Sequence, residues 1–514
     1  MEILGYDILN LFSLTNMLCI LLGTVVGMVF GALPGLGTVI AVALLLPLTF
    51  TLPPLAGILM LLATYQAGEY GGSISAILLG VPGTPQAAAS VLDGNAMAIH
   101  NSPGKALTYS LVSSSIGGIF GGLVLIFVSI PLATFALNFG SPEYFLIGVI
   151  GLMAVGLLSG KDKIKSMISI VLGLMAGTIG VDTLTGVDRA TFGRPELMDG
   201  INLVAFLVGM FAISELFIMI SKGLNKRHIT DHKKLKTGLT AKEYKGIVKP
   251  TMVGSTIGAF TGILPGIGGG AACWFAYAVM KKLSKKPEAF GKGSPEGIAA
   301  PESSNNASAG GALVPFLALG IPGSAAIAII MGAFIMHGIQ PGPNVIKTEQ
   351  ELVYGIFYGF LLTTVAMYII GRLLTPMFSR ILLVPNSFLV SIVLVMCLIG
   401  IFASKSSFFD LWLALGVGVV FYFLKRLDYS VPSVIIAYVL APIIEENFRR
   451  SLTLSSGSYE IFFSNIYAIV LVLIIISIVA VSIFGEYKKK GGHDLAKIER
   501  ATLMAKKKFK GGDV

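Results

Sequence analysis

Charged residues are scarce in this chain of 514 amino acids. Asp, Glu, Lys and Arg together make up 12% of it and apolar residues 54%, whereas about 25% of the residues of a soluble protein are charged. This composition excludes a soluble globular enzyme. The charges lie in short runs between apolar stretches of roughly 17 to 30 residues, the length that a membrane-spanning helix requires. We therefore expect an all-α, polytopic membrane protein.

Signatures of several other protein classes are also missing. The three cysteines, Cys19, Cys273 and Cys397, lie far apart in apolar stretches, so neither a disulfide framework nor a metal site beyond a possible sodium ion is predicted. The motifs GxxxxGK(S/T) and HExxH are absent, which argues against a P-loop ATPase and a zinc peptidase. The net charge of +10 comes from Lys and Arg that flank apolar segments, so no nucleic-acid partner is expected.

Two motifs occur twice in the same order. GTVVGMVFGALPGLG at 23–37 matches GSTIGAFTGILPGIG at 254–268, and LLGVPGT at 78–84 matches ALGIPGS at 318–324. Ordered repetition over such a distance indicates a duplicated unit. We accordingly divide the chain into a first transmembrane repeat (1–221), a basic cytoplasmic linker (222–250), a second transmembrane repeat (251–450), an extra C-terminal transmembrane helix (451–487) and a basic cytoplasmic tail (488–514).

The distribution of basic residues predicts the topology. The linker carries nine Lys or Arg and two acidic residues, which places it in the cytoplasm by the positive-inside rule. Segment 251–280 begins and ends beside basic residues and is interrupted at Pro265-Gly266, so we expect a re-entrant hairpin of two half-helices. Its twin 17–50, interrupted at Pro34-Gly35, follows acidic residues and no basic ones, which places its ends outside.

Counting the remaining segments predicts how the two repeats are related. Each repeat crosses the membrane about five times, an odd number, so the repeats should be inverted relative to each other, with the N-terminus outside and the C-terminus inside. Arg449 and Arg450 then fall outside, where Glu445 and Glu446 should offset them. The expected segments are a broken crossing at 52–92, helices near 106–137, 143–159, 166–180 and 201–221, a broken crossing at 301–336, helices near 353–375, 386–402, 408–424 and 431–444, and a last helix near 464–485.

Four Pro-Gly pairs interrupt apolar segments at matching positions of the repeats, namely 34–35, 82–83, 265–266 and 322–323. Backbone amides without partners are costly in hydrocarbon, so such breaks are tolerated where protein, water or a ligand satisfies the freed groups. The N-terminus of a half-helix presents N–H groups and a positive dipole end, which favour an anionic substrate. The alternative is that Pro and Gly only kink these helices.

A polar cluster precedes the second break of each repeat. One cluster, at 65–75, contains Glu69, and the other, at 300–311, contains Glu302. A carboxylate inside a membrane segment is costly and therefore indicates a function. Together with nearby hydroxyl and amide oxygens it can hold Na⁺, or it can carry a proton itself. The alternative for Glu302 is a place at the cytoplasmic start of a helix.

Small and basic residues supply two further features. Glycines spaced four apart form ridges that we interpret as helix-packing surfaces. Arg189 and Arg194 lie in a predicted outer loop, where they either guide an anion or are simply solvated. The ridge glycines are Gly23, Gly27 and Gly31 in the first repeat and Gly254, Gly258 and Gly262 in the second.

Five stretches resemble the large membrane subunit of tripartite tricarboxylate transporters. They are GALPGLG (31–37), GGSISAILLGVPGTPQAAASVLDG (71–94), TGVDRATFG (185–193), GILPGIGGG (262–270) and PESSNNASAGGALVPFLALGIPGS (301–324). The resemblance implies a multi-pass protein of the bacterial cytoplasmic membrane and not an enzyme. It also implies a small membrane subunit, a periplasmic solute-binding protein, and import of a tricarboxylate or another small carboxylate by symport with Na⁺ or H⁺, without a cofactor.

The alternative function is that of a binding-protein-independent carboxylate carrier or channel.

The resemblance and the two polar clusters together give the candidate residues. The substrate-binding candidates are Gly35, Gly37, Gly83, Thr84, Pro85, Gly266, Gly268, Gly323 and Ser324. The coupling-ion candidates are Glu69, Glu302, Ser304, Asn305 and Asn306.

Overall fold

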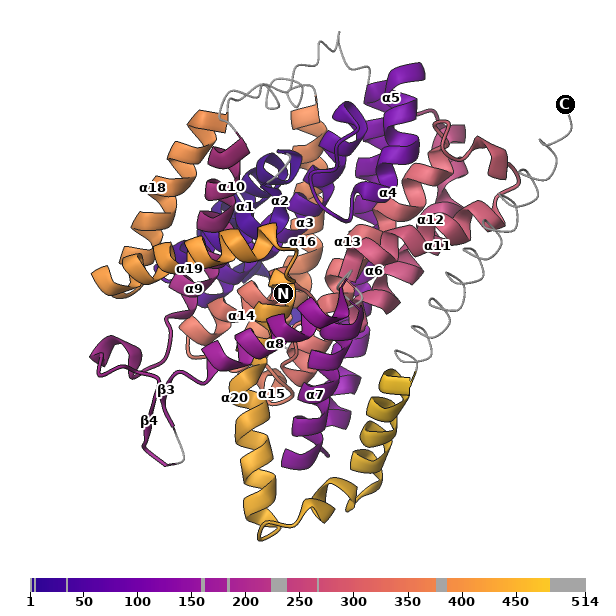
Figure 1. Ribbon diagram of the computed structural model, residues 1–514. Coiled ribbons are helices and arrows are strands. Elements are labelled where there is room, and N and C mark those ends of the chain that lie inside the picture. Colours follow the sequence, from indigo (N-terminus) through magenta and orange to yellow (C-terminus); the bar gives the residue numbers. More distant parts are fainter. Residues whose placement is uncertain are drawn as a thin grey trace, which may run out of the picture.

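The computed structural model describes residues 2–3, 6–33, 36–158, 162–182, 185–222, 238–265, 268–375 and 386–480, and its regular structure is helical apart from two short strand pairs (Figure 1). Within these residues, six helices are long and apolar enough to cross a membrane, at 14–32, 103–136, 203–221, 350–374, 408–426 and 431–454. The predicted all-α, multi-pass class is therefore confirmed. The basic tail 488–514 and much of the linker lie outside the described residues.

The elements follow one another in two similar series. The first half contains α1 (Leu14–Ala32), α2 (Gly37–Thr49), α3 (Pro54–Leu79), α4 (Ala88–Ser90), α5 (Ala96–His100), α6 (Pro103–Ala136), α7 (Ser141–Leu158), α8 (Lys163–Gly177), α9 (Leu203–Val208) and α10 (Ser214–Lys222). The second contains α11 (Ala241–Ile263), α12 (Gly268–Leu283), α13 (Pro295–Leu319), α14 (Ala325–Met336), α15 (Val345–Thr348), α16 (Gln350–Leu374), α18 (Asn386–Lys405), α19 (Phe408–Arg426) and α20 (Val431–Leu454). The strands are β1 (Glu2–Ile3), β2 (Tyr6–Asp7), β3 (Gly180–Val181) and β4 (Asp188–Arg189), and a further helix covers Ile466–Ala480.

Most expected segments coincide with these helices, but two boundaries were wrong. α13 begins at Pro295 instead of 301, because Ser294 caps it and proline is well suited to the first helical position. α20 continues to Leu454 instead of ending at 444. Its polar last turns are stabilised by ion pairs described below.

The duplicated motifs form duplicated structure. α1 and α11 both end on a leucine in an extended conformation, Leu33 and Leu264, as expected for a residue that precedes proline. α3 and α13 both end on a glycine with positive φ, Gly80 at 69° and Gly320 at 74°, a conformation that glycine adopts without steric cost.

Each ridge of glycines packs closely against the next long helix of its repeat. Gly23, Gly27 and Gly31 lie in this order against Met60, Thr64 and Gly68, and Gly254, Gly258 and Gly262 lie in this order against Ala300, Ser304 and Ser308. A methyl group on any of the six glycines would lie 2.0–2.4 Å from a backbone oxygen. The predicted packing role is confirmed, and the rising order shows that α1 is parallel to α3 and α11 to α13.

α2 and α12 run back along the same long helices. Gly57, at the start of α3, contacts Thr49 at the end of α2, whereas Gly68, further along α3, contacts Thr38 at the start of α2. In the second repeat, Gly269 at the start of α12 lies beside Ser308 of α13. The later part of α12 lies near the start of α13, because Asp93 bonds both Tyr277 and the Ser294 N–H. Each pair, α1–α2 and α11–α12, is therefore a helical hairpin.

Both hairpins turn part-way along their long helices. Gly31, the last ridge glycine of α1, contacts Gly68, which is 11 residues before the end of α3 (79 − 68). Gly262, the last ridge glycine of α11, contacts Ser308, which is also 11 residues before the end of α13 (319 − 308). At a rise of 1.5 Å per residue this is about 17 Å. The two tips are thus at equivalent depths.

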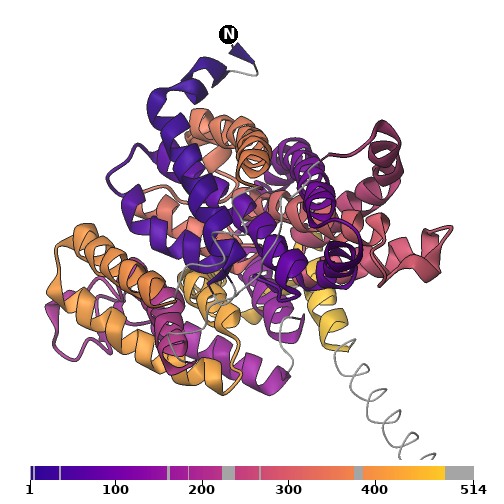
Figure 2. The ribbon, with the colours of Figure 1, turned by 90° about the horizontal axis from the view of Figure 1, so that it is seen from above.

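α3 and α13 run in opposite directions. The end of α3 lies near the start of α13, because Asn95 donates to Ile77 O (3.0 Å) and the neighbouring Asp93 accepts from the Ser294 N–H (2.7 Å). Tyr65, in the first half of α3, has its Oη 3.2 Å from Oγ of Ser324, just beyond α13. Seen from above, α18 and α19 (orange) form one flank of the molecule and α11 and α12 (rose) the other (Figure 2).

Candidate functional site

The carboxylate of Glu69 lies on α3 at the depth of the two hairpin tips. Glu69 is 2% exposed. Gln86 Nε2 donates to its Oε1 (3.3 Å), and Asn305 Nδ2, from α13, donates to its backbone oxygen (3.3 Å). The side chains of Asn305 and of Thr38, in the first turn of α2, face the carboxylate. Segments from both repeats therefore meet at this one acidic group.

Several polar atoms around Glu69 are buried without a hydrogen-bond partner. They are Thr38 Oγ1, Glu69 Oε2, Gln86 Oε1 and Asn305 Oδ1. Buried polar atoms are nearly always hydrogen-bonded, so a cluster of unpartnered ones indicates a place for a ligand, an ion or water. All four are oxygens, which makes the cluster suited to a cation and not to an anion.

Three predicted substrate residues, Gly37, Gly83 and Thr84, lie next to this cluster. The Gly83 N–H donates to Gly72 O (3.1 Å), and a methyl group on Gly37 would lie 3.4 Å from Gly83 O. Thr84 packs its side chain on Gly72. The break after α3 is therefore folded back onto α3 and touches the start of α2.

The start of α12 approaches the same place from the second repeat. A methyl group on Gly269 would lie 3.0 Å from Gln86 Cγ and 3.5 Å from Asn305 Oδ1, and one on Gly270 would lie 3.8 Å from Pro85 O. The structure thus brings Gly37, Gly83, Thr84, Pro85 and the helix start at Gly268 together around Glu69 and Asn305. Gly35 and Gly266 lie outside the described residues.

The last two substrate candidates, Gly323 and Ser324, lie between α13 and α14, and Ser324 contacts α3 one turn before Glu69. Gly323 packs on Ala312, as Gly83 packs on Gly72 in the first repeat. Ser324 caps α14 by accepting from the Ile327 N–H (3.3 Å), and its Oγ meets the Tyr65 hydroxyl. Tyr65 is four residues before Glu69 on α3, so this contact borders the site without entering it.

Glu302 occupies a separate pocket made of serines. It lies two turns inside α13 and is 1% exposed, so the alternative of a surface position at a helix start is wrong. Ser110 and Ser114 of α6 donate to its Oε2 at 2.9 and 3.0 Å, and Ser90 donates to its Oε1. Both carboxylate oxygens are therefore satisfied by hydroxyl groups. The spacing of Ser110 and Ser114, one helical turn, is the only sequence signal for this pocket.

Asn306 and Ser304 face other neighbours. Asn306 Nδ2 donates to Gln66 O (3.1 Å), and the Gln66 side chain is held by Thr363 (2.9 Å) and Thr364 (2.7 Å) of α16. Ser304 lies against the glycine ridge of α11. Of the five coupling-ion candidates, only Glu69 and Asn305 are thus placed side by side.

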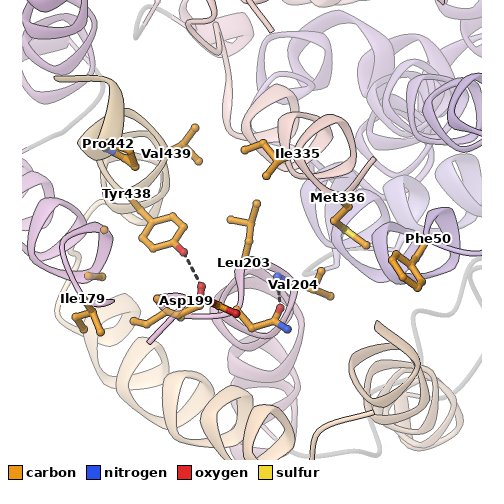
Figure 3. A pocket seen from close by; sticks show the side chains of 15 residues that line it. Phe50, Ile179, Asp199, Leu203, Val204, Ile335, Met336, Tyr438, Val439 and Pro442 are labelled. Carbon is orange, nitrogen blue, oxygen red and sulfur yellow. Dashed lines mark hydrogen bonds between the residues drawn. The ribbon is translucent and has the colours of Figure 1, made fainter. Parts of the chain in front are cut away.

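A pocket of about 440 Å³ opens where α2, α14 and α20 approach one another (Figure 3). Phe50 and Met336 lie on one side of it and Tyr438 and Pro442 on the other. Its lining is mostly apolar, and the Tyr438 hydroxyl is used by a hydrogen bond to Ile201 O (2.9 Å). This chemistry suits a passage or an apolar group better than a carboxylate.

A neighbouring pocket of about 430 Å³ is lined by residues that form ion pairs. Arg189 Nη1 is 2.6 Å from Glu445 Oε1, and Arg449 Nη1 is 2.7 Å from Asp182 Oδ2. Arg449 is thus paired with Asp182 and with Glu445 (3.5 Å). The charge of Arg189 is neutralised by Glu445 and Asp182, which argues against a role of Arg189 in guiding an incoming anion.

Comparisons with known proteins cover almost the whole chain. The model of the family described as tripartite tricarboxylate transporter TctA family matches residues 17–436. An uncharacterized 52.8 kDa protein in the TAR-I ttuC' 3' region of Agrobacterium vitis is 34% identical over 475 residues, which are 92% of this chain and 94% of that protein. An uncharacterized protein in the TAR-II ttuC' 3' region of the same organism is 35% identical over 208 residues, which are 40% of this chain and 86% of that protein. No solved structure matches the chain.

Proposed function

Because the chain belongs to the tripartite tricarboxylate transporter TctA family, the large membrane subunits of these transporters, we propose that it imports a tricarboxylate or another small organic carboxylate by symport with Na⁺ or H⁺. Family membership makes it a membrane component of tricarboxylate transport and not an enzyme. A tripartite system includes a small membrane subunit and a periplasmic solute-binding protein, and we propose that the latter delivers the substrate.

The helix directions support two inverted repeats with re-entrant hairpins. α1 and α3 are parallel, α11 and α13 are parallel, and α3 and α13 are antiparallel, so one unit is turned over relative to the other. α1 is long enough to cross a membrane. Its tip nevertheless lies part-way along α3, and α2 returns beside it. Inverted repeats with broken helices that meet near the middle of the bilayer are an architecture of secondary transporters.

Contacts between basic residues and their neighbours support the proposed orientation. Lys105, at the start of α6, pairs with Glu243 at the start of α11 (2.6 Å), and this ammonium group together with Thr240 holds the pKa of Glu243 at about 2. Lys425 pairs with Glu215 of α10 (3.2 Å). Lys105 thus contacts the linker and Lys425 contacts the helix that leads into it, on the side that we assign to the cytoplasm, so that the N-terminus is outside and the C-terminus inside.

We place the substrate at the hairpin tips and the coupling ion beside them. Leu36, which precedes α2, makes no side-chain cap to the first N–H groups of the helix, and N–H groups at a helix start can bind a carboxylate. Glu69 and Asn305 are the coupling-ion residues that border this place. The contact between them, from two oppositely directed helices at the depth of both tips, is the observation that carries the proposal.

Uptake of labelled citrate and a panel of dicarboxylates into proteoliposomes tests this function. The vesicles contain this chain and the small subunit, with and without the binding protein, under separate Na⁺ and H⁺ gradients. We expect accumulation that requires both the binding protein and one gradient. Accumulation without the binding protein would favour the alternative, a self-sufficient carboxylate carrier, and absence of any accumulation would contradict both.

A further inference from the structure

We propose that Thr38, Glu69, Gln86 and Asn305 together form a binding site for a dehydrated Na⁺ ion. The inference rests on the proposed symport function and narrows its coupling ion from Na⁺ or H⁺ to Na⁺ at one defined place. It adds Thr38 and Gln86, two residues that lie outside the predicted polar clusters. The four residues come from α2, α3, the segment after α3, and α13.

The donor atoms carry the first step of the argument. One hydroxyl, one carboxylate and two amide groups each leave an oxygen buried and unpartnered, and Thr38, Glu69 and Asn305 are each 2% exposed. In Gln86 and Asn305 the amide nitrogen is already used in a hydrogen bond to Glu69, which leaves the oxygen of each amide toward the cluster. Hard cations are bound by such sets of oxygen ligands.

The charge of the cluster distinguishes a monovalent from a divalent ion. Glu69 supplies one negative charge, and the ion pairs that the described residues form involve other carboxylates. The second nearby carboxylate, that of Glu302, is hydrogen-bonded to Ser90, Ser110 and Ser114 in its own pocket, so it is not a ligand of this cluster. Burial of charge is costly unless it is compensated. A single carboxylate therefore matches a single positive charge.

The convergence of the unpartnered oxygens favours Na⁺ over a proton. With a proton on Glu69, its Oε2 would donate one hydrogen bond and the Thr38 hydroxyl a second, each to a single acceptor, so the oxygens would be joined in separate pairs. A small cation among the four oxygens contacts all of them at once. The serine pocket of Glu302 shows the contrast, because there hydroxyl groups of the chain donate to both carboxylate oxygens.

The position of the site links the ion to the substrate. Thr38 lies in the first turn of α2, directly after the first hairpin tip, and Gly269 at the start of α12 lies beside Asn305 and Gln86. A cation here would bind α2 to α13 and would fix the helix start that faces the substrate. We therefore expect Na⁺ to bind before the carboxylate and to strengthen its binding, which is the coupling that symport requires.

Binding of ²²Na⁺ to the purified full chain, without substrate or binding protein, tests the site. The salt is exchanged against choline chloride at constant ionic strength. We expect saturable binding by the wild type and at least about tenfold weaker binding by Thr38→Val and by Gln86→Leu, the loss that follows when one ion contact is removed. Thr24→Val and Ser129→Ala are the matched controls, since Thr24 bonds only Ile20 O within α1 and Ser129 is a buried, unpartnered hydroxyl on α6. Both controls should bind Na⁺ like the wild type.

Two results would overturn the inference. The first is the absence of saturable ²²Na⁺ binding by the wild-type protein. The second is an unchanged Na⁺ affinity of the Gln86→Leu variant. This variant decides the outcome if Thr38→Val does not fold, because Gln86 is half-buried in a loop and its replacement should leave the fold intact. The outcome is separable from that of the proposed function. Carboxylate uptake driven by protons alone would remove the Na⁺ site and keep the transporter, whereas Na⁺ binding without any uptake would keep the site and remove the transport function.

Discussion

Replacing Gly258 by Ala should force α11 away from α13. The added methyl group would lie 2.1 Å from Ser304 O, where ordinary contact begins at 3.4 Å, so the helices must separate by roughly 1.3 Å (3.4 − 2.1) or bend. Because the obstacle is backbone, no side-chain rotation relieves it. Overpacking of this kind costs about 1–3 kcal/mol, and we expect the free energy of unfolding to fall by that amount.

The same helix provides the control for this prediction. Gly246 has no atom within 4 Å of an added methyl group, so Gly246→Ala should stabilise α11 by up to about 1 kcal/mol through helix propensity alone. Unfolding of both variants in mixed detergent micelles, followed by circular dichroism, should separate them by about 1–4 kcal/mol. Equal stability of the two variants would refute the close approach of the hairpin to α13.

Substitutions at three further residues, Glu302, Asp93 and Asp182, test the buried polar contacts. Glu302→Leu leaves its serine hydroxyls without an acceptor and should lower the free energy of unfolding by about 3 kcal/mol, whereas Glu302→Gln, which keeps an acceptor, should cost less than about 1.5 kcal/mol; equal losses would contradict the serine pocket. Asp93→Ala removes the acceptor of three backbone N–H groups and should cost about 2–4 kcal/mol, as measured by the same unfolding experiment; a loss below about 0.5 kcal/mol would be inconsistent with that clamp. Asp182→Ala should cost about 1 kcal/mol, because its partner Arg449 is 36% exposed, and this loss should be smaller in the Arg449→Ala background, where the contacts of Asp182 with Arg189 and with the Thr185 N–H remain; an equal loss in both backgrounds would contradict the pair.

The helices and the duplication could be predicted because they depend on local pattern. Apolar length, flanking charge and the repeated Pro-Gly motifs are all properties of short stretches. The start of α13 could also be predicted, since Ser294-Pro295-Glu296 is a typical helix start, although the predicted crossing began at 301. The end of α20 could not be predicted, because charged residues such as Glu445 and Arg449 are typical of a loop. The ion pair that keeps this part helical joins Arg449 to Asp182, which is far away in the sequence.

The site could be predicted only in part. Glu69 and Asn305 stand out as polar residues in apolar stretches, and the structure places them together. Thr38 did not stand out, because a threonine among apolar residues is ordinary in a membrane helix. The serines around Glu302 come from sequence separations of 188 to 212 residues, a pairing that depends on tertiary packing and not on local pattern.

Concentrative uptake by the Glu69→Gln variant is the most direct test of the central claim, that the acidic group between the two repeats couples the ion gradient to carboxylate import. Gln has nearly the same shape as Glu but no charge, so the fold should be retained, which gel filtration can verify. In proteoliposomes with the small subunit and the binding protein, we expect wild-type protein to accumulate labelled carboxylate against its gradient and the variant to lose that accumulation. Normal accumulation by a correctly folded variant would show that Glu69 takes no part in coupling.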